Sequence, residues 1–356
     1  MTVTREQVLA YRAARHGLAP GTAPDGALLD LGVQDTPAGS AALALSARGL
    51  AGDGLVTVWS FRGAPHRHRA GDLRALSKAT WPLSEPDAYA RLGGLGATLK
   101  KAGRSGVEAI ATTARAVRDL VADGTAKGEL SAAVTAAIPD EYSFWCRGCG
   151  ATHVHDQLLR LSALHGGALL ATSTPLTFGR IERWSGPPAR AEGAERLLRA
   201  YLTLHGPATP ADAAGYLGSG GPHVKAVWPE GLAEVRVEGR QAWLPEEAAG
   251  ALRDAAPVPF TRLVPPSDPY LQARDRALLV PDAAHRKALW TVLAGPGAVV
   301  ADGEVAGLWR AKQAGKGRLR LTVTPWRAVD RAAVEEEAAR VAAVRGTPSV
   351  EVAFER

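Results

Sequence analysis

The residues from 195 to 245 constrain the fold of this chain more than any other segment, because they predict elements in the order helix, helix, helix, hairpin. Residues 195–205 carry apolar side chains at helical spacing. Thr209-Pro210 then supplies an N-cap and a proline for the first position of a second helix. A third short helix over 223–228 precedes two short strands that meet at Gly239. This order is that of a winged helix-turn-helix.

The same order of elements recurs in the N-terminal segment and, more loosely, in the middle of the chain. The N-terminal segment opens with capping-box spacing between Thr4 and Gln7. Its later elements are predicted helices over 27–31 and 37–48 and strands over 55–61 and 64–69. The middle segment has predicted helices over 105–122, 128–138 and 156–165, and strands over 168–172 and 180–184. The sequence therefore predicts three winged-helix units, which share element order without visible sequence identity.

The C-terminal residues read differently, as short strands separated by turn signals. The predicted strands cover 260–264, 278–281, 298–300, 305–309 and 319–323, and a helix over 330–345 precedes a last strand over 350–354. We therefore predict an α+β chain of tandem winged helix-turn-helix units followed by a small C-terminal β-barrel-like domain. The predicted segments are 1–100, 101–190, 191–255 and 256–356.

Composition narrows the class of protein. The chain has 356 residues, of which 46% are hydrophobic and 22% charged, which is typical of folded globular domains. Its two cysteines cannot form a disulfide framework. It shows neither a signal-peptide pattern nor an apolar run of about 18 residues, so we expect a cytoplasmic protein without a membrane span. The net charge of +6 permits a polyanionic partner without requiring one.

Basic residues gather around the predicted wings and near the C-terminus, where they could neutralise phosphates. A solvated charged face is the alternative for each cluster. Together, several clusters on a winged-helix scaffold favour double-stranded DNA as the partner. The helix over 223–228 offers only His223 and Lys225, which favours binding that does not depend on base sequence. The candidate DNA-binding residues are Arg62, His66, Arg67, His68, Arg69, Lys100, Lys101, Arg104, Arg236, Arg240, Lys312, Lys316 and Arg318.

A Cys/His cluster stands out in the middle of the chain. Cys146 and Cys149 have the spacing of a zinc knuckle, and His153 and His155 follow closely. These four side chains could close a tetrahedral zinc site, so structural zinc is a possible cofactor. Two alternatives are a pair of small buried thiols and a catalytic Cys–His pair.

The segment Gln34-Asp35-Thr36-Pro37 precedes a predicted helix. Thr36 suits the N-cap of that helix and Pro37 its first position. Asp35 would then lie near the positive end of the helix dipole. Local structure alone therefore accounts for the Thr-Pro pair.

Several stretches resemble one known family. They are LLDLGVQDTPAGSAALALSARG, VTVWSFRGAPHRHR, RLVPPSDPYLQARDR and VVADGEVAGLWR. The chain is similar to the winged-helix DNA-binding family that contains the AlkZ-like bacterial glycosylases for DNA interstrand crosslinks. The resemblance implies tandem winged helices and a C-terminal β-barrel around duplex DNA. It places Arg62, Gly63 and His66 near the DNA backbone, and it gives Asp268 and Arg274 the role of a buried structural ion pair.

Glycosylases of this family carry a Gln-x-Gln or Gln-x-Asp motif that orients a water against C1′ of an alkylated nucleotide. Gln34 matches the first motif position, but Thr36 occupies the second and Asp35 lies between them. The candidate catalytic residues are therefore Gln34, Asp35 and Thr36. We expect a monomer that binds duplex DNA and excises alkylated N7-purine or crosslinked bases, with no required cofactor. One alternative is a non-catalytic DNA-binding or regulatory protein, and another is an enzyme built on Cys146, Cys149 and His153.

Overall fold

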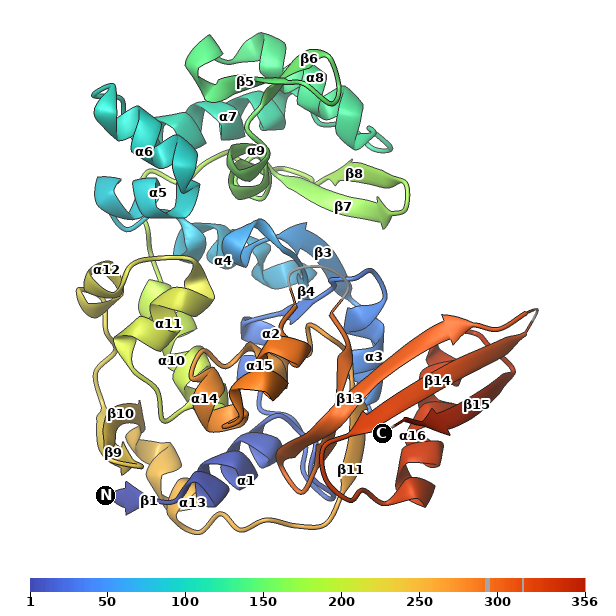
Figure 1. Cartoon of the computed structure of the whole chain (residues 1–356). Coiled ribbons are helices and arrows are strands. Elements are labelled where there is room, and N and C mark those ends of the chain that lie inside the picture. The colour runs from blue at the N-terminus through green and yellow to red at the C-terminus, as the bar shows by residue number, and fades with distance from the viewer. Residues whose placement is uncertain (292–294, 316, 356) are drawn as a thin grey trace. The chain divides into compact units, whose positions relative to one another are not determined.

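The computed structural model describes residues 1–291, 295–315 and 317–355, which form helices and sheets in alternation (Figure 1). The predicted α+β class is therefore confirmed. By their internal contacts, these residues form two compact units. Unit 1 comprises Met1–Asp53, Arg199–Asp212 and Pro229–Arg356, and unit 2 comprises Gly54–Leu198 and Ala213–Trp228. These limits do not coincide with the four predicted segments, whose division stays a prediction.

Unit 1 begins with a short strand and a capped helix. Strand β1 (Thr2–Val3) leads into α1 (Arg5–Arg15), where Thr4 and Gln7 form the predicted capping box. Residues 8–13 of α1 are all buried, so this helix is enclosed by the core on every side over that stretch. Helix α2 (Ala27–Asp30), strand β2 (Val33–Gln34) and helix α3 (Ser40–Ser46) follow.

A curled sheet forms the C-terminal part of unit 1. Its strands run in the order β11 (Thr261–Val264), β12 (Gly297–Ala301), β13 (Glu304–Gln313), β14 (Arg318–Pro325) and β15 (Ser349–Phe354). Helix α16 (Arg331–Val344) packs Val334 and Val341 against Leu321 and its neighbours. The alternation of buried and exposed residues in β14 explains this face, because strand side chains point to opposite sides in turn.

One predicted strand of this region is wrong. Residues 278–281 do not pair in the sheet; the chain forms α14 (Arg276–Leu279) and then α15 (Ala283–Leu289). Asp282 accepts a hydrogen bond from the His285 backbone N–H and caps α15, so local capping and not strand pairing decides this stretch.

The segment from 194 to 253 has the predicted order of elements. It contains α10 (Ala194–His205), α11 (Pro210–Leu217), α12 (Gly221–Lys225), β9 (Leu232–Val237) and β10 (Arg240–Pro245), and α13 (Ala249–Arg253) follows. Thr209 Oγ1 accepts a hydrogen bond from the Asp212 backbone N–H at 3.2 Å, which confirms the predicted cap of α11. Strand β9 pairs with β10 and, in parallel, with β1. The winged-helix geometry itself stays a prediction.

Unit 2 combines helices with strands. Its main sheet runs β4 (Pro65–Arg69), β3 (Leu55–Trp59), β7 (Ala168–Ser173) and β8 (Leu176–Arg180). Its helices are α4 (Leu73–Thr80), α5 (Glu85–Leu92), α6 (Gly94–Lys101), α7 (Gly106–Leu120), α8 (Lys127–Ala137) and α9 (Asp156–Ala163).

Two further features of unit 2 bear on the predictions. The strand predicted over 180–184 is wrong, because β8 ends at Arg180 after pairing tightly with β7. A separate hairpin joins β5 (Ser143–Cys146) and β6 (Ala151–Val154) and carries the Cys/His cluster. Throughout the part of the chain that is described, helices are too short or too polar to traverse a lipid bilayer.

Candidate active site and nucleic-acid interface

The segment Gln34–Pro37 lies in unit 1 and is clamped by one serine. Ser267 Oγ donates a hydrogen bond to the Gln34 carbonyl at 3.1 Å and accepts one from the Thr36 backbone N–H at 3.3 Å. The hydroxyl therefore bridges the two residues that flank Asp35. Ser267 is 4% exposed, so solvent does not compete for these bonds.

Asp35, and not Thr36, is the residue whose side chain caps the amino end of α3. Its Oδ1 accepts a hydrogen bond from the Ala41 backbone N–H at 2.9 Å. The predicted cap by Thr36 and the predicted helix start at Pro37 are wrong, because the chain turns through Gly39, with φ of 90°, before α3 begins. Gln34 and Asp35 are half-buried, whereas Thr36 is exposed.

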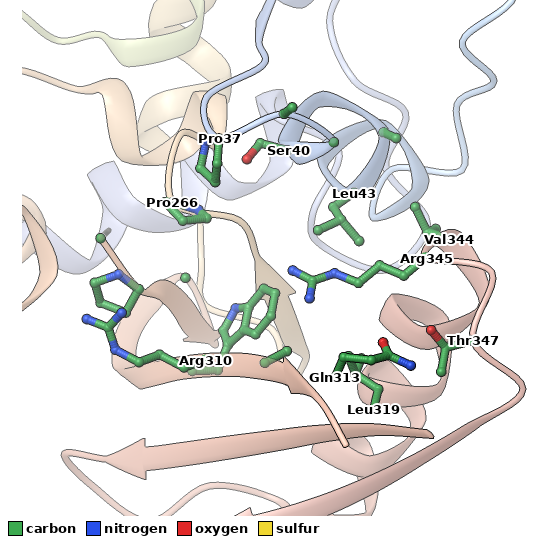
Figure 2. Close-up of a pocket in the computed structure, with 18 residues that line it drawn as sticks. Pro37, Ser40, Leu43, Pro266, Arg310, Gln313, Leu319, Val344, Arg345 and Thr347 are labelled. Carbon is green, nitrogen blue, oxygen red and sulfur yellow. The ribbon is translucent and has the colours of Figure 1, made fainter. Parts of the chain in front are cut away.

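A hollow of about 690 Å³ begins directly after this segment (Figure 2). Pro37 and Ser40 line it from one side, and Arg310 and Arg345 line it from the other. Trp309 forms part of its wall and donates its indole N–H to the Val264 carbonyl at 2.8 Å, which fixes the ring. The guanidinium groups of Arg310 and Arg345 make the lining of this hollow suited to a polyanion, and the Gln34–Thr36 segment directly precedes its first lining residue in the chain.

A buried ion pair anchors the clamp. Arg48 and Asp268 meet in two hydrogen bonds of 2.7 and 2.8 Å, and both side chains are fully buried. Arg48 also donates to the carbonyls of His16 and Ala44, each at 2.7 Å. Asp268 follows Ser267 directly, so this pair fixes the residue that holds Gln34 and Thr36. The expected pairing of Asp268 with Arg274 is wrong, because Arg48 reaches the carboxylate from α3's end.

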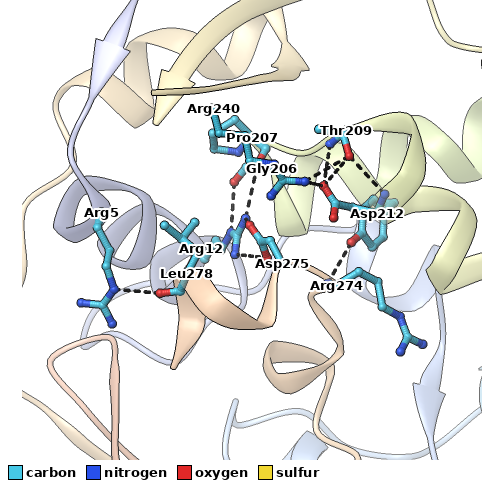
Figure 3. A network of polar contacts seen from close by, with 11 residues as sticks. Arg5, Arg12, Gly206, Pro207, Thr209, Asp212, Arg240, Arg274, Asp275 and Leu278 are labelled. Atoms are coloured by element: carbon cyan, nitrogen blue, oxygen red, sulfur yellow. Dashed lines mark hydrogen bonds and ion pairs between the residues drawn. The ribbon is translucent and has the colours of Figure 1, made fainter. Parts of the chain in front are cut away.

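A second buried pair anchors the residues around Arg274 (Figure 3). Arg12 donates to both carboxylate oxygens of Asp275, at 2.9 and 2.6 Å. The flanking Arg274 and Arg276 line an open hollow of about 540 Å³ instead. This second hollow is basic on balance, because its lining also includes Arg240, Arg286 and Lys287 beside the carboxylates of Asp212 and Asp275, and the ring of Trp290.

Within this basic hollow, some cations already have partners. Arg240 donates to Thr209 Oγ1 at 3.1 Å and pairs with Asp212. The Arg276 guanidinium lies over the Trp290 ring at 4.7 Å, and burial lowers the pKa of Arg276. An anion entering the hollow would meet an excess of positive charge in partly desolvated surroundings, where electrostatic attraction is stronger than in water.

Two of the predicted DNA-binding residues on strand β4 are buried, so the prediction for them is corrected. His66 and His68 are each 1% exposed, because the alternation of the strand turns them inward. Burial, followed by the nearby charge of Arg62, holds the pKa of His66 well below its ordinary range. Burial lowers the pKa of His68 to about 3. Both rings are neutral at pH 7 and cannot neutralise phosphates.

Other residues of the first predicted wing are partly exposed. Arg67 and Arg69 point outward from β4, and Arg69 pairs with Asp72 at 3.1 Å. Arg62 lies over the Tyr216 ring at 5.1 Å and donates to the Tyr216 carbonyl. This wing therefore presents fewer available cations than its sequence suggests.

The hairpin of β13 and β14 presents its basic residues together. Lys312 pairs in register with Arg320, and Arg310 with Thr322. Arg310, Lys312, Arg318 and Arg320 are all exposed, whereas Leu319 and Leu321, which alternate with the two β14 arginines, are buried. Side chains alternate between the two faces of a strand, which buries the histidines of β4 and places these cations together on one face of the hairpin. Lys316 lies outside the described residues.

The remaining predicted cations are exposed. Lys100 and Lys101, at the end of α6, are exposed, and so is Arg104, which pairs with Glu141 at 3.3 Å. Arg236 is exposed on β9.

The structure brings together part of the predicted metal site. The ligand atoms of Cys146, Cys149 and His153 lie within 4.8 Å of one another. His155 is wrong as a fourth ligand, because the strand ends at Val154 and His155 opens α9. Its ring lies beside Phe144 at 4.9 Å between centroids.

Sequence reasoning missed Ser267, the pairing partners Arg48 and Arg12, and the basic hollow. The stretch PPSDPYLQARDR carries the signal, since it contains both buried aspartates and the flanking arginines. Their partners lie more than two hundred residues away along the chain, at Arg48 and Arg12. No local pattern identifies such partners.

The comparisons with known proteins agree with one another. A model of the family described as DNA glycosylase AlkZ-like matches residues 31–344. The interstrand DNA cross-link repair glycosylase of Streptomyces sahachiroi is 33% identical over 184 residues, or 48% of this chain and 47% of that protein. The matched region thus spans about half the length of this curated relative.

A solved structure shows the same fold over the full length. The Streptomyces sahachiroi DNA glycosylase AlkZ has a TM-score of 0.74 against this chain, with 24% sequence identity and 100% of both chains covered. The family match extends over most of the sequence, from the Gln34 segment to the end of α16. The chain therefore belongs to the AlkZ-like DNA glycosylase family.

Proposed function

We propose that the chain is a DNA glycosylase that hydrolyses the N-glycosidic bond of alkylated bases, with N7-alkylpurines or crosslinked bases as substrates in duplex DNA. The observation that carries this proposal is the fixed Gln34–Thr36 segment, which directly precedes the residues that line the hollow containing Arg310 and Arg345. Ser267 holds its backbone on both sides of Asp35. The carboxylate is thereby placed on a rigid support, as catalysis by preorganised charge requires.

Hydrolysis of the N-glycosidic bond of an N7-alkylpurine requires few catalytic groups from the protein. Alkylation at N7 makes the purine cationic, so it departs as a neutral base when its bond to C1′ breaks. The sugar then develops positive charge, which the Asp35 carboxylate stabilises through space. Gln34 and Thr36 orient a water whose oxygen bonds to C1′, and the proton released by that water passes to Asp35 or to solvent.

The cationic surfaces of unit 1 supply the affinity for DNA. The basic hairpin face, formed by Arg310, Lys312, Arg318 and Arg320, and the hollow around Arg274 would bind phosphates. Such contacts position a duplex without reading its bases. Binding would accordingly be salt-dependent and tolerant of sequence, with the tandem winged helices of the prediction as its scaffold.

A base-release assay tests the catalytic step. Duplex DNA containing N7-methylguanine is incubated with the protein, and abasic sites are counted after alkaline cleavage. Asp35→Asn keeps an oxygen that accepts from Ala41 but removes the charge, so it separates catalysis from helix capping. We expect it to lower release by about a hundredfold or more. Asp53→Asn makes the same charge change on an exposed carboxylate and should leave release unchanged.

Two further variants test which residues orient the attacking water. Gln34→Ala and Thr36→Ala should each lower release less than Asp35→Asn does, since they orient a water but do not stabilise charge. Wild-type release equal to spontaneous depurination across N7-methyl, bulkier N7-alkyl and crosslinked substrates would refute the proposal.

A second function is favoured by one observation. Thr36 stands at the second motif position, and a hydroxyl is a weak base at neutral pH. A DNA-binding protein without chemistry would keep the fold and the basic surfaces. Salt-dependent duplex binding by wild type, with no release from any adduct, would establish that function.

A further inference from the structure

The β5–β6 hairpin of unit 2 has a tight turn that brings two sulfur atoms together. The Cys146 carbonyl accepts hydrogen bonds from the backbone N–H groups of Cys149 and Gly150, at 3.3 and 2.9 Å. Gly150 has φ of 62°, a conformation that favours glycine. The backbone therefore folds Cys149 back over the strand that carries Cys146.

The register of the hairpin adds a nitrogen on the same side. Cys146 pairs with Ala151, and His153 lies two residues further along β6. Because side chains alternate along a strand, Cys146 and His153 share one face, and Trp145 occupies the other. All the ligand atoms of Cys146, Cys149 and His153 fall within 4.8 Å of one another. In a tetrahedral zinc site, sulfurs at about 2.3 Å from the metal lie about 3.8 Å apart, so small side-chain rotations close this site.

The histidine gives a second reason. His153 Nε2 is buried and makes no hydrogen bond to any residue within the described ranges. A buried polar atom without a partner costs about 1–3 kcal/mol unless another group satisfies it. A metal ion bound between the thiolates would satisfy it directly. A structural pair of inert thiols would leave this nitrogen unexplained, and it would not require Cys149 to be exposed.

We propose that Cys146, Cys149 and His153 bind one Zn²⁺, with a water molecule in the fourth position. Both thiols lose their protons to solvent on binding, and the neutral imidazole supplies Nε2. Two thiolates balance the charge of the ion, so the site is electrically neutral. This inference concerns unit 2 and is independent of the proposed glycosylase chemistry.

The metal would fix a part of the hairpin that little else holds. The base is anchored by buried Tyr142 and Val154, and the Val154 N–H donates to Thr135 Oγ1 at 2.8 Å. The tip, by contrast, exposes Phe144 by 40% and Trp145 by 63%. An isolated hairpin is marginally stable in water, so a metal clip at the turn would set its register. Zinc removal should therefore loosen the tip and leave the remainder of the unit folded.

Metal analysis of the purified full-length chain, free of any histidine tag, is the test. The chain is loaded with Zn²⁺ under reducing conditions, passed through a desalting column and analysed by mass spectrometry of the metal. We expect about one zinc per chain. Cys146→Ser, Cys149→Ser and His153→Gln should each weaken binding by about tenfold or more in competition with a chromophoric chelator. His155→Gln is the matched control and should bind as wild type does.

Cobalt absorption and tryptophan fluorescence are two further measurements, and neither would change if the cluster bound no metal. Co²⁺ should produce thiolate charge-transfer absorption and the intense visible bands of a tetrahedral site. Chelation should change the emission of wild type but not of Trp145→Phe. Absence of zinc from the reduced wild type, an octahedral cobalt spectrum, equal binding by His153→Gln, or a Cys146–Cys149 disulfide that forms in the presence of zinc would each overturn the proposal.

Discussion

Two loops of unit 1 are anchored in the same way but present different groups. The Gln34–Pro37 loop depends on Ser267 and, through its neighbour Asp268, on the buried cation of Arg48. The residues around Arg274 depend on Asp275 and the cation of Arg12. In the first case the anchor holds the polar groups of Gln34, Asp35 and Thr36, to which we assign the catalytic step. In the second it turns two arginines toward an open basic hollow.

The difference between the loops lies in how completely each anchor is sealed. The side chains of Arg48 and Asp268 are 0% exposed, whereas those of Arg12 and Asp275 are 1% and 4% exposed. Asp275 also lines the open hollow, so this buried carboxylate lies nearer to solvent than Asp268 does. A sealed anchor suits chemistry that needs fixed geometry. An anchor at the border of an open hollow suits phosphate binding, which tolerates small displacements.

Removal of one charge from each anchor should give the largest effect. Asp268→Asn leaves the Arg48 cation buried without a counter-ion, and we expect it to lower the free energy of unfolding by about 3–5 kcal/mol. Asp275→Asn should cost less, at or below about 3 kcal/mol, because that carboxylate borders the open hollow and is slightly less buried than Asp268. Urea denaturation of both variants measures the difference.

Asp254→Asn is the control for these variants, because Asp254 is exposed on the surface of unit 1. Its effect should stay within about 0.5 kcal/mol. Equal costs for the two buried aspartates would show that the anchors do not differ in the way their exposure indicates.

The two anchors also share a buried histidine, which makes unit 1 sensitive to acid. Burial, followed by the charges of His205, Arg48 and Arg12, holds the pKa of His16 well below 6.5. Below pH 6.5 the unfolded chain binds a proton that folded His16 does not, so stability is present above that pH and is lost as the pH falls. The slope approaches about 1.4 kcal/mol per pH unit.

The measurement compares wild type with His16→Gln in urea between pH 7.5 and 5. The variant should lose less stability on acidification, whatever its stability at neutral pH. Parallel curves would mean that His16 titrates alike in the folded and unfolded chains.

Loss of the Ser267 hydroxyl should affect catalysis more than binding. Ser267→Ala removes the bonds to the Gln34 carbonyl and the Thr36 N–H, each worth about 1 kcal/mol. We expect base release at saturating enzyme to fall about tenfold, with little change in duplex affinity. Arg276→Ala should do the reverse, because it removes a cation of the basic hollow. Equal changes in base release and in duplex affinity for the two variants would show that the two loops do not differ in function.

Local patterns predicted the elements of the fold better than they predicted the site. The capping boxes at Thr4 and Thr209 depend on neighbours three residues away, so a short stretch of sequence is enough to predict them. The sequence prediction starts α3 too early, because Asp35 reaches Ala41 across the turn at Gly39 and a cap by the adjacent Thr36 is the simpler local pattern. The clamp by Ser267 joins residues 231 positions apart or more, and only the folded chain shows it.

The basic strands make the same point about charge. Both β4 and the β13–β14 hairpin read as cationic, yet period two hides His66 and His68 and exposes Lys312 and Arg318. The sequence contains that period, and it becomes informative once the buried face of each strand is known. A count of basic residues therefore overestimates the exposed charge of β4 but not that of the β13–β14 hairpin.

The smallest predicted effect tests those two strands against each other. Arg318→Ala removes one exposed cation of the hairpin, so the slope of log affinity for duplex DNA against log salt concentration should fall by about 0.9. His68→Gln removes a ring that is neutral because burial lowers its pKa to about 3, and the slope should stay as in wild type. Fluorescence anisotropy with a labelled duplex over a salt series measures both slopes, and circular dichroism checks that the buried substitution leaves the fold intact. A reduced slope for His68→Gln alone would place the DNA on β4 and not on the hairpin.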